Sequence, residues 1–342
     1  MKVFHIESGL GNQMLSYSEL LLSKKLNPQE KEYYVETIIY EIPECNEVIN
    51  QWYGYELKEI FKVATPNVKE LFTENQWQSI ISRVRKSRFW LNWDYPEVIV
   101  SALNEEGLKL KNYRGHIDLS STHSLKGILT NNKIGYEVKR LLRPLYEKRY
   151  IQAMSDKAKM HIVSNEDIYT GQWLGLMKEE SGVELIEKEI RDCFQFPDFC
   201  DSENLEMLQT IIGSNSVAIH ARRGDALGTN SYCYKYGYFK RAVRYIKKTV
   251  NQPLFIFFTD PGSMDWIRQN LSVFGLSNHY DHLLFVTWNK GKNSYRDMQL
   301  MSYCKHNIIT FSSFGWWGAF LNKNPEKITC SPSVWINTTN HF

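Results

Sequence analysis

Ser216-Val-Ala-Ile-His-Ala-Arg-Arg-Gly-Asp225 is the stretch from which the fold of this chain can be worked out. It is a short apolar strand that ends in a histidine, followed at once by two arginines, a glycine and a carboxylate. Ligands of open α/β sheets bind outside the carboxyl ends of strands, and a guanidinium grips a phosphate through two parallel hydrogen bonds. The stretch therefore predicts an anion site, with a diphosphate as the natural ligand. A local Arg–Asp pair on the surface explains the same residues equally well at this point.

The second half of the chain repeats this pattern of strand and helix. Apolar strands are expected at 216–220, 254–258, 283–287, 307–310 and 327–330, and helices near 236–249, 264–271, 295–304 and 314–322. Such alternation predicts a parallel sheet covered by helices. We expect two domains, 1–205 and 206–342, with the last residues packing back on the first domain.

Polar residues follow three more of these strands. Thr259-Asp-Pro-Gly262 follows the strand at 254–258. Asp297 lies on the helix after the strand at 283–287, and this helix has an apolar face. Phe311-Ser-Ser-Phe-Gly-Trp-Trp-Gly-Ala319 follows the strand at 307–310. Two serines at a helix start either cap the helix or bind an anion there. Arg222 follows another strand of the same sheet, so Arg222 and these serines would bind one diphosphate from two sides.

The N-terminus predicts a similar unit. A strand at Lys2–Ile6 runs into Ser8-Gly-Leu-Gly-Asn-Gln13, a helix follows to about Lys25, and a second strand is expected at 33–39. This layout lets backbone N–H groups approach a ligand closely. The turn lacks the third glycine of a dinucleotide fingerprint, so an ordinary tight turn is the alternative.

Composition excludes several classes of protein. A net charge of +3 is too small to indicate a nucleic-acid partner, and none of the six cysteines forms C-x-x-C, which argues against a zinc ribbon or disulfide framework. His279-x-x-His282 with Asp281 lacks a third metal ligand. The start of the chain is too polar for a signal peptide, so a cytoplasmic protein is expected.

A basic and aromatic segment at 83–93 is the one hint of a membrane. Arg83, Arg85, Lys86 and Arg88 lead into Phe89-Trp-Leu91. Such a segment is compatible with peripheral contact at the inner face of an anionic membrane. A solvated helix face is the alternative.

Three motifs in order carry a family resemblance. With Gly9-Leu-Gly-Asn-Gln-Met14, His220-Ala-Arg-Arg-Gly-Asp225 and Ser312-Ser-Phe-Gly-Trp-Trp-Gly-Ala319, the chain resembles the α-1,2-fucosyltransferases of glycosyltransferase family 11. The resemblance implies a GT-B-like α/β fold: two Rossmann-like domains facing a cleft, the N-terminal one with many added helices. It also implies an inverting enzyme of bacterial type that needs no metal or other cofactor. Such an enzyme moves L-fucose from GDP-β-L-fucose to the 2-hydroxyl of a β-galactoside, in an oligosaccharide or a lipid-linked glycan.

The resemblance also implies roles for single residues. The chain contains no Asp-x-Asp, so fixed positive groups would neutralise the departing diphosphate. Arg222 is the residue expected to do so, and Asp225 is the first candidate for a general base, with Glu7 second. The other donor-side residues are His220, Arg223, Asp260, Asp297, Ser312, Ser313 and Phe314, and those on the cleft or acceptor side are Gly11, Asn12 and Gln13.

Some positions depart from the family pattern. Ser8 and Gly315 stand where family members usually have glycine and serine, and Phe311 stands in place of asparagine. The core α-1,6 enzymes carry a glutamate near the position of Asn230. These departures keep two alternatives open: a transferase for another GDP-sugar, and an inactive homologue that binds GDP or a glycan. The oligomeric state is not predicted.

Overall fold

The computed structural model describes residues 1–47, 53–91, 95–111, 113, 133–170, 174, 182–224 and 226–332. The chain divides into two compact units, one of Met1–Ile117 with Lys148–Pro197 and one of Asp118–Glu147 with Asp198–Phe342. Residue 205, where the sequence-based division lies, falls inside α8 (Ser202–Ile212), within the second unit. Asp225 and the C-terminal tail expected to pack on the first domain lie outside the described residues.

The second unit is built on a five-stranded sheet in the order β6-β5-β4-β7-β8, with every pair parallel. The chain starts at the centre of the sheet, runs outward to one edge and then returns to the other side of β4. The strand order therefore reverses between β4 and β7, and such a switch point is where open α/β sheets bind ligands. The strands are β4 (Asn215–Ala221), β5 (Pro253–Thr259), β6 (His282–Phe285), β7 (His306–Ile309) and β8 (Thr329–Cys330).

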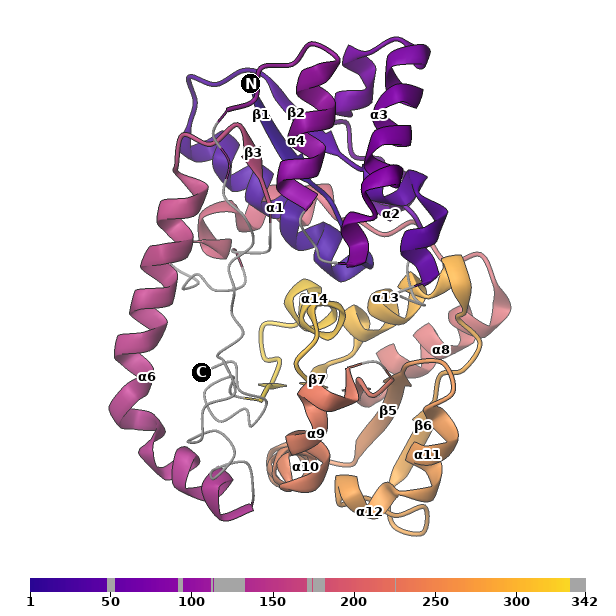
Figure 1. Ribbon diagram of the computed structural model, residues 1–342. Helices are drawn as coiled ribbons and strands as arrows, with labels where there is room; N and C mark the ends of the chain where they lie inside the picture. Colours follow the sequence, from indigo (N-terminus) through magenta and orange to yellow (C-terminus); the bar gives the residue numbers. More distant parts are fainter. Residues whose placement is uncertain are drawn as a thin grey trace. The chain divides into compact units, whose positions relative to one another are not determined.

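Helices cover both faces of this sheet (Figure 1). Side chains of a strand alternate between faces, so Val217 and Ile219 pack on one helical layer and Ala218 on the other. The first layer holds α9 (Leu227–Lys235), α10 (Tyr238–Thr249), α11 (Met264–Gln269) and α12 (Leu271–Phe274); the second holds α8, α13 (Tyr295–Tyr303) and α14 (Ser313–Leu321).

Gly318 lets α13 and α14 pack closely. A Cβ atom at Gly318 would lie 2.8 Å from Cε and 2.9 Å from Cβ of Met301. Real Cβ atoms do not come this close to other carbons, so the glycine of the Trp-Trp-Gly-Ala motif is a packing requirement.

The first unit has a three-stranded parallel sheet in the order β2-β1-β3, surrounded by many helices. The expected α/β class, with a parallel sheet in each of two units, is thus confirmed; the cleft expected between them stays a prediction. The strands are β1 (Lys2–His5), β2 (Tyr33–Glu36) and β3 (Ile168–Tyr169). The helices are α1 (Leu10–Leu26), α2 (Glu56–Phe61), α3 (Glu74–Ser87), α4 (Tyr95–Glu105), α6 (Lys133–Ile162) and α7 (Glu187–Cys193), and α6 also contributes its first half to the second unit. Short 3₁₀ helices lie at η1 (Ile38–Glu41), η2 (Pro43–Glu47), η3 (Val68–Leu71), η4 (Phe89–Leu91), η7 (Val183–Ile186) and, in the second unit, η8 (Gly291–Asn293).

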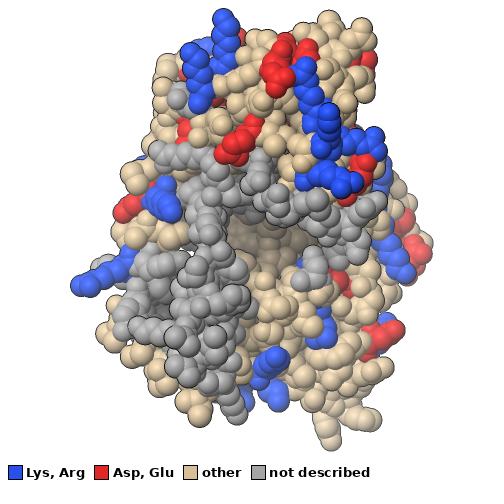
Figure 2. Space-filling view, viewed as in Figure 1, with Lys and Arg blue, Asp and Glu red and all other residues tan. Residues whose placement is uncertain are grey.

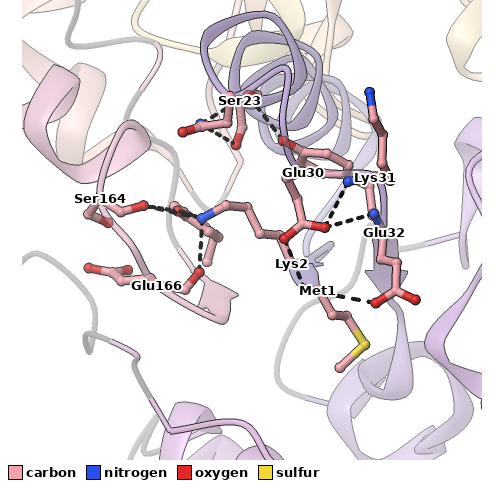
Figure 3. Close-up of polar contacts among 11 residues, drawn as sticks. Met1, Lys2, Ser23, Glu30, Lys31, Glu32, Ser164 and Glu166 are labelled. Atoms are coloured by element: carbon pink, nitrogen blue, oxygen red, sulfur yellow. Dashed lines mark hydrogen bonds and ion pairs between the residues drawn. The ribbon is translucent and has the colours of Figure 1, made fainter.

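A buried lysine ties β1 to the chain that follows α6 (Figure 3). The Lys2 ammonium donates to the carbonyl oxygens of Ser164 and Glu166, each at 3.2 Å, and to the Tyr169 hydroxyl at 2.8 Å. Burying a charge is costly unless hydrogen bonds satisfy it, and here three bonds do so. This contact fixes β3 beside β1 although 162 residues separate Lys2 from Ser164.

In the described part of the basic and aromatic segment, residues 83–91, two aromatic rings pack inward, which contradicts their interpretation as a membrane contact. Phe89 and Trp90 are buried in the core of the first unit. Arg83 is paired with Glu105, and the Nε of Arg85 donates to Glu44 at 2.6 Å. The two rings therefore pack in the core, and Arg83 and Arg85 pair with carboxylates of the same unit.

The charge of the described surface on the face in Figure 2 is mixed. On the face in Figure 2, lysine and arginine side chains lie among aspartate and glutamate rather than forming one basic patch. Among the described helices, none has the length and apolar character needed to cross a bilayer.

The backbone at Ser8 shows why glycine suits this position of the family pattern. Ser8 has φ +66°, in the left-handed region that favours glycine. Its carbonyl oxygen accepts hydrogen bonds from Gln13 Nε2 at 3.0 Å and from the Tyr40 hydroxyl at 2.7 Å, which hold the turn in this conformation.

Replacing Ser8 by glycine is expected to raise the free energy of unfolding by about 0.5 kcal/mol, because relief of the left-handed strain exceeds the entropic cost of glycine. Ser8→Val is expected to lower it by about 1–2 kcal/mol. Denaturant unfolding measures both. Ser101→Gly, on the exposed face of α4, is the control and should destabilise; a loss of stability in Ser8→Gly as large as in this control would contradict the strain argument.

Candidate functional site

The second unit gathers polar groups at one edge of its sheet. Because all its strands are parallel, their carboxyl ends lie at the same edge. His220 and Arg222 stand at the end of β4, Asp260 follows β5, and Thr310 and Ser312 follow β7. The switch point between β4 and β7 therefore lies within this group, all of which except Thr310 are predicted site residues.

Asp260 holds the loop after β4, residues 222–224, which we call the arginine loop. Its buried carboxylate pairs with the Arg222 guanidinium and accepts the backbone N–H of Arg223 at 2.5 Å. Gly224, with φ +26°, brings the loop so close that a Cβ there would lie 3.3 Å from Asp260 Cγ. Asp260 thus orients Arg222, whose side chain keeps 22% of its surface exposed.

The ends of β4 and β7 are joined by two residues that sequence analysis did not identify in this role. Thr310 Oγ1 accepts the Arg222 backbone N–H and donates to the His220 carbonyl, each at 3.1 Å. Asn230, from α9, accepts the Phe311 N–H at 2.9 Å and donates to its carbonyl at 3.2 Å. We call the segment 310–313, between β7 and the start of α14, the serine loop. Asn230, near the position of the glutamate of the α-1,6 enzymes, is buried and holds this loop through Phe311.

Arg223 is held differently from its neighbour. Its guanidinium carbon lies 3.4 Å from the centre of the Trp266 ring and 5.0 Å from that of Tyr234. Cation–π contacts of this kind fix an arginine against its aromatic partner. The two adjacent arginines are thus oriented by different groups, Arg222 by a carboxylate and Arg223 by an indole.

The serine loop opens α14. Ser312 is the N-cap residue, with extended backbone at φ −161°, and its hydroxyl makes no capping hydrogen bond. Ser312, Ser313 and Phe314 are half-buried. The first N–H groups of a helix have no partners within it and carry partial positive charge, which suits an anion.

His220 lies against the first turn of α14. Its ring stacks on Phe314 with 5.6 Å between centres, and a Cβ at Gly315 would lie 2.4 Å from His220 Nδ1. Burial, with a further contribution from Arg222, lowers the pKa of His220 to about 3, so the ring is neutral at physiological pH. Gly315 leaves room for this ring, which gives a physical reason for the missing family serine.

Asp297 has an unusual carboxyl group. Surrounding protein raises its pKa to about 7, although a hydrogen bond from Asn289 Nδ2 at 2.8 Å works in the opposite direction. Asn204 in turn bonds Asn289, and it accepts the Trp288 indole N–H at 3.0 Å. This network holds a carboxylate beyond the end of β6, where N–H donors of a ligand would be suitable partners.

The first unit places its predicted residues differently from expectation. Gln13 is fully buried: its amide donates to Ser8 O at 3.0 Å and Gly54 O at 2.8 Å and accepts the Glu56 N–H at 2.9 Å. Gln13 was expected to face a ligand. Instead, its side chain lies inside the protein and its hydrogen bonds hold the turn in place. Gly11 is buried and Asn12 half-buried.

A charged cluster lies at the carboxyl end of this smaller sheet. His5 and Glu36 are register partners in β1 and β2 and form an ion pair, and Glu7 Oε2 lies 3.7 Å from His5 Nε2. Burial alone would lower the pKa of His5, but Glu36 and Glu7 raise it to about 10. The imidazolium therefore remains charged at neutral pH beside Glu7, the second candidate for a base.

Metal ligands do not gather in the described ranges: no group of three or more His, Cys, Asp or Glu side chains there could hold an ion. The expectation of a reaction without metal stays a prediction.

The fold and the site define an α/β protein that offers an arginine and a helix N-terminus to an anion. Residues 97–340 match the family model described as glycosyl transferase family 11, so the chain belongs to this family. The matched range includes the whole site in the second unit and begins after the Gly-Leu-Gly-Asn-Gln turn.

Curated relatives support this membership over part of the chain. The chain is 34% identical over 133 residues to the O-antigen biosynthesis glycosyltransferase WbnK of Escherichia coli, covering 37% of this chain and 41% of that protein. It is 34% identical over 138 residues to an α-1,2-colitosyltransferase of Escherichia coli, covering 38% and 44%. It is 31% identical over 113 residues to the galactoside 2-α-L-fucosyltransferase SEC1 of Bos taurus, covering 32% and 29%. The chain thus spans less than half the length of each of these relatives.

A solved structure of the α-1,6-fucosyltransferase NodZ co-crystallised with GDP overlaps with 92% of this chain and 90% of its own, at a TM-score of 0.44 and 10% identity.

Gly315→Ala is expected to destabilise the second unit by about 1–3 kcal/mol, because the new methyl group would collide with the buried His220 ring. Thermal unfolding measures the effect. Gly228→Ala, in α9, is the matched control, since a Cβ there meets nothing within 4 Å; it should be neutral or stabilising. The double variant His220→Ala/Gly315→Ala should lose less stability than the sum of the single variants, and strict additivity would contradict the contact.

Proposed function

We propose that this protein is an inverting, metal-independent fucosyltransferase that moves L-fucose from GDP-β-L-fucose to the 2-hydroxyl of a β-galactoside. Family membership and the names of the relatives support a transferase of this type. The observation that carries the proposal is Arg222, oriented by Asp260 at a switch point whose other side is the N-terminus of α14.

The proposed reaction breaks the bond between fucose C1 and the β-phosphate oxygen, and the electron pair leaves with GDP. The acceptor oxygen bonds to C1 from the opposite face and loses its proton. Negative charge grows on the diphosphate, and Arg222 with the first N–H groups of α14 would stabilise it without a metal. The proton would go to a carboxylate, for which Asp225 and Glu7 are the candidates.

The nucleotide would be recognised beside this diphosphate site. Guanine presents a ring N–H and an amino group on one edge, and a carboxylate such as Asp297 can accept both. The neutral His220 ring, stacked on Phe314, offers an uncharged surface that does not repel the arginines. Ser312 and Ser313 supply hydroxyls to the phosphates.

A second candidate donor is GDP-colitose. The identity with an α-1,2-colitosyltransferase favours it, and colitose differs from fucose by the loss of one hydroxyl group. Phe311 and Gly315 replace polar residues of the family pattern, so fewer side chains are available to bind a sugar hydroxyl at these positions.

The proposal is tested by incubating the purified protein with GDP-fucose, GDP-colitose or GDP-mannose and a set of β-galactosides, with EDTA present. Linkage is determined by NMR. We expect fucose on the galactose 2-hydroxyl with inverted anomeric configuration. Transfer only from another donor, a different linkage, or tight GDP binding without transfer would each contradict it, the last in favour of an inactive homologue.

Arg222→Ala is expected to lower kcat about 10²–10³-fold, as for loss of one preorganised group that stabilises charge in the transition state. Arg222→Lys should recover part of the loss, since lysine keeps the charge without the bidentate geometry. Arg268→Ala is the control, because this arginine is partly exposed and pairs with Asp265 on its own helix. Near-normal kcat in Arg222→Ala, measured by initial rates at saturating donor, would exclude the role.

GDP binding is expected to weaken as pH falls below about 7, because the pKa of Asp297 is raised to about 7 and the protonated acid accepts fewer hydrogen bonds. Calorimetry between about pH 8 and about pH 6 measures this. Asp297→Asn should bind GDP more weakly, with less pH dependence and less preference for GDP over ADP. An unchanged preference in the variant would remove Asp297 from guanine recognition.

A further inference from the structure

Helix α6 exposes apolar side chains along its first half. Ile134 is 78% exposed, Leu141 71% and Leu145 69%, and Val138 and Leu142 are 47% and 40% exposed. None of these five belongs to the hydrophobic cores formed by the described residues. We call these five residues the α6 stripe.

The α6 stripe is one continuous surface. Successive members are four, three, one and three residues apart in the sequence. At about 100° of rotation per residue, all five fall within an arc of about 100°. An apolar stripe this wide normally faces a core, so its exposure indicates a surface made for contact.

The net charge of the segment that carries the stripe indicates the kind of partner. Residues 133–150 contain two acidic residues, Glu137 and Glu147, and six basic ones: Lys133, Lys139, Arg140, Arg143, Lys148 and Arg149. Two copies of this helix packed together would bring two segments of net positive charge together, which disfavours such a pair. An anionic surface would attract the same charges, and a basic amphipathic helix is typical of segments that lie in a membrane interface.

We propose that the α6 stripe docks on an anionic lipid bilayer, with the helix axis parallel to the membrane and its basic residues among the headgroups. No described helix could span the bilayer, so α6 would lie on its surface. The proposal moves the membrane contact from Phe89 and Trp90, which are buried, to a helix with apolar side chains in solvent. It is independent of the proposed transfer reaction.

Sedimentation with vesicles tests the proposal. The full chain is mixed with vesicles rich in phosphatidylglycerol or made of phosphatidylcholine alone. We expect binding to the anionic vesicles that weakens with added salt, and much weaker binding to the neutral ones. Ile134→Gln/Leu141→Gln/Leu145→Gln should lower the apparent affinity at least about tenfold, with unchanged thermal unfolding because all three side chains are exposed.

Two further variants serve as controls. Ile212→Gln removes a 57% exposed side chain from α8 and should leave vesicle binding unchanged. Arg149→Gln, at an exposed position of α6, should weaken binding to anionic vesicles only. Failure of the wild type to bind, equal binding by the triple variant, or a wild-type dimer that the triple variant abolishes would overturn the proposal; the last result would assign the stripe to a second copy of the chain.

Discussion

The buried carboxylate of Asp260 is the constraint on which the candidate site depends. It pairs with the Arg222 guanidinium and accepts the N–H of Arg223, and Gly224 allows the loop to close around it. A guanidinium free in solution would have to be ordered when a diphosphate arrives. Held in advance by a carboxylate, it loses little freedom on binding, and electrostatic stabilisation is most effective when it is already in place.

The side chains next to Arg222 help to keep the positive charge of the candidate site on this residue. His220 is neutral because it is buried beside Arg222, and Arg223 rests on the Trp266 ring instead of sharing Asp260 through its side chain. Thr310 and Asn230 then tie the arginine loop to the serine loop, so the two sides of the switch point are positioned together. The candidate site consists of two loops held together by buried polar bonds, and the proposed function assigns Arg222 and the start of α14 to the ligand.

Much of the fold could be predicted because its signals are local. Apolar runs separated by amphipathic segments are enough to predict a parallel sheet, and the end of a parallel strand is a known place for ligands. The positions of Arg222 and Ser312 after parallel strands were predicted in this way, and the structure confirms these positions. The segment at 83–93 was misread because its composition suits a membrane surface as well as a core, and only packing shows that Phe89 and Trp90 are buried. Gln13 was placed at a ligand for the same reason, since a glutamine in a glycine turn can serve either the ligand or the turn.

By itself the sequence determined the α/β class, the order of strands and helices in the second unit, the family resemblance and the residues at the strand ends. The tertiary structure decided which of those residues support one another: that Asp260 orients Arg222 across 38 residues, that Thr310 receives the Arg222 N–H across 88, and that Gly315 makes room for His220. The reason is physical. Strand and turn preferences act over a few neighbouring residues, whereas ion pairs, capping bonds and close contacts depend on strand register and on helices packed from distant parts of the chain.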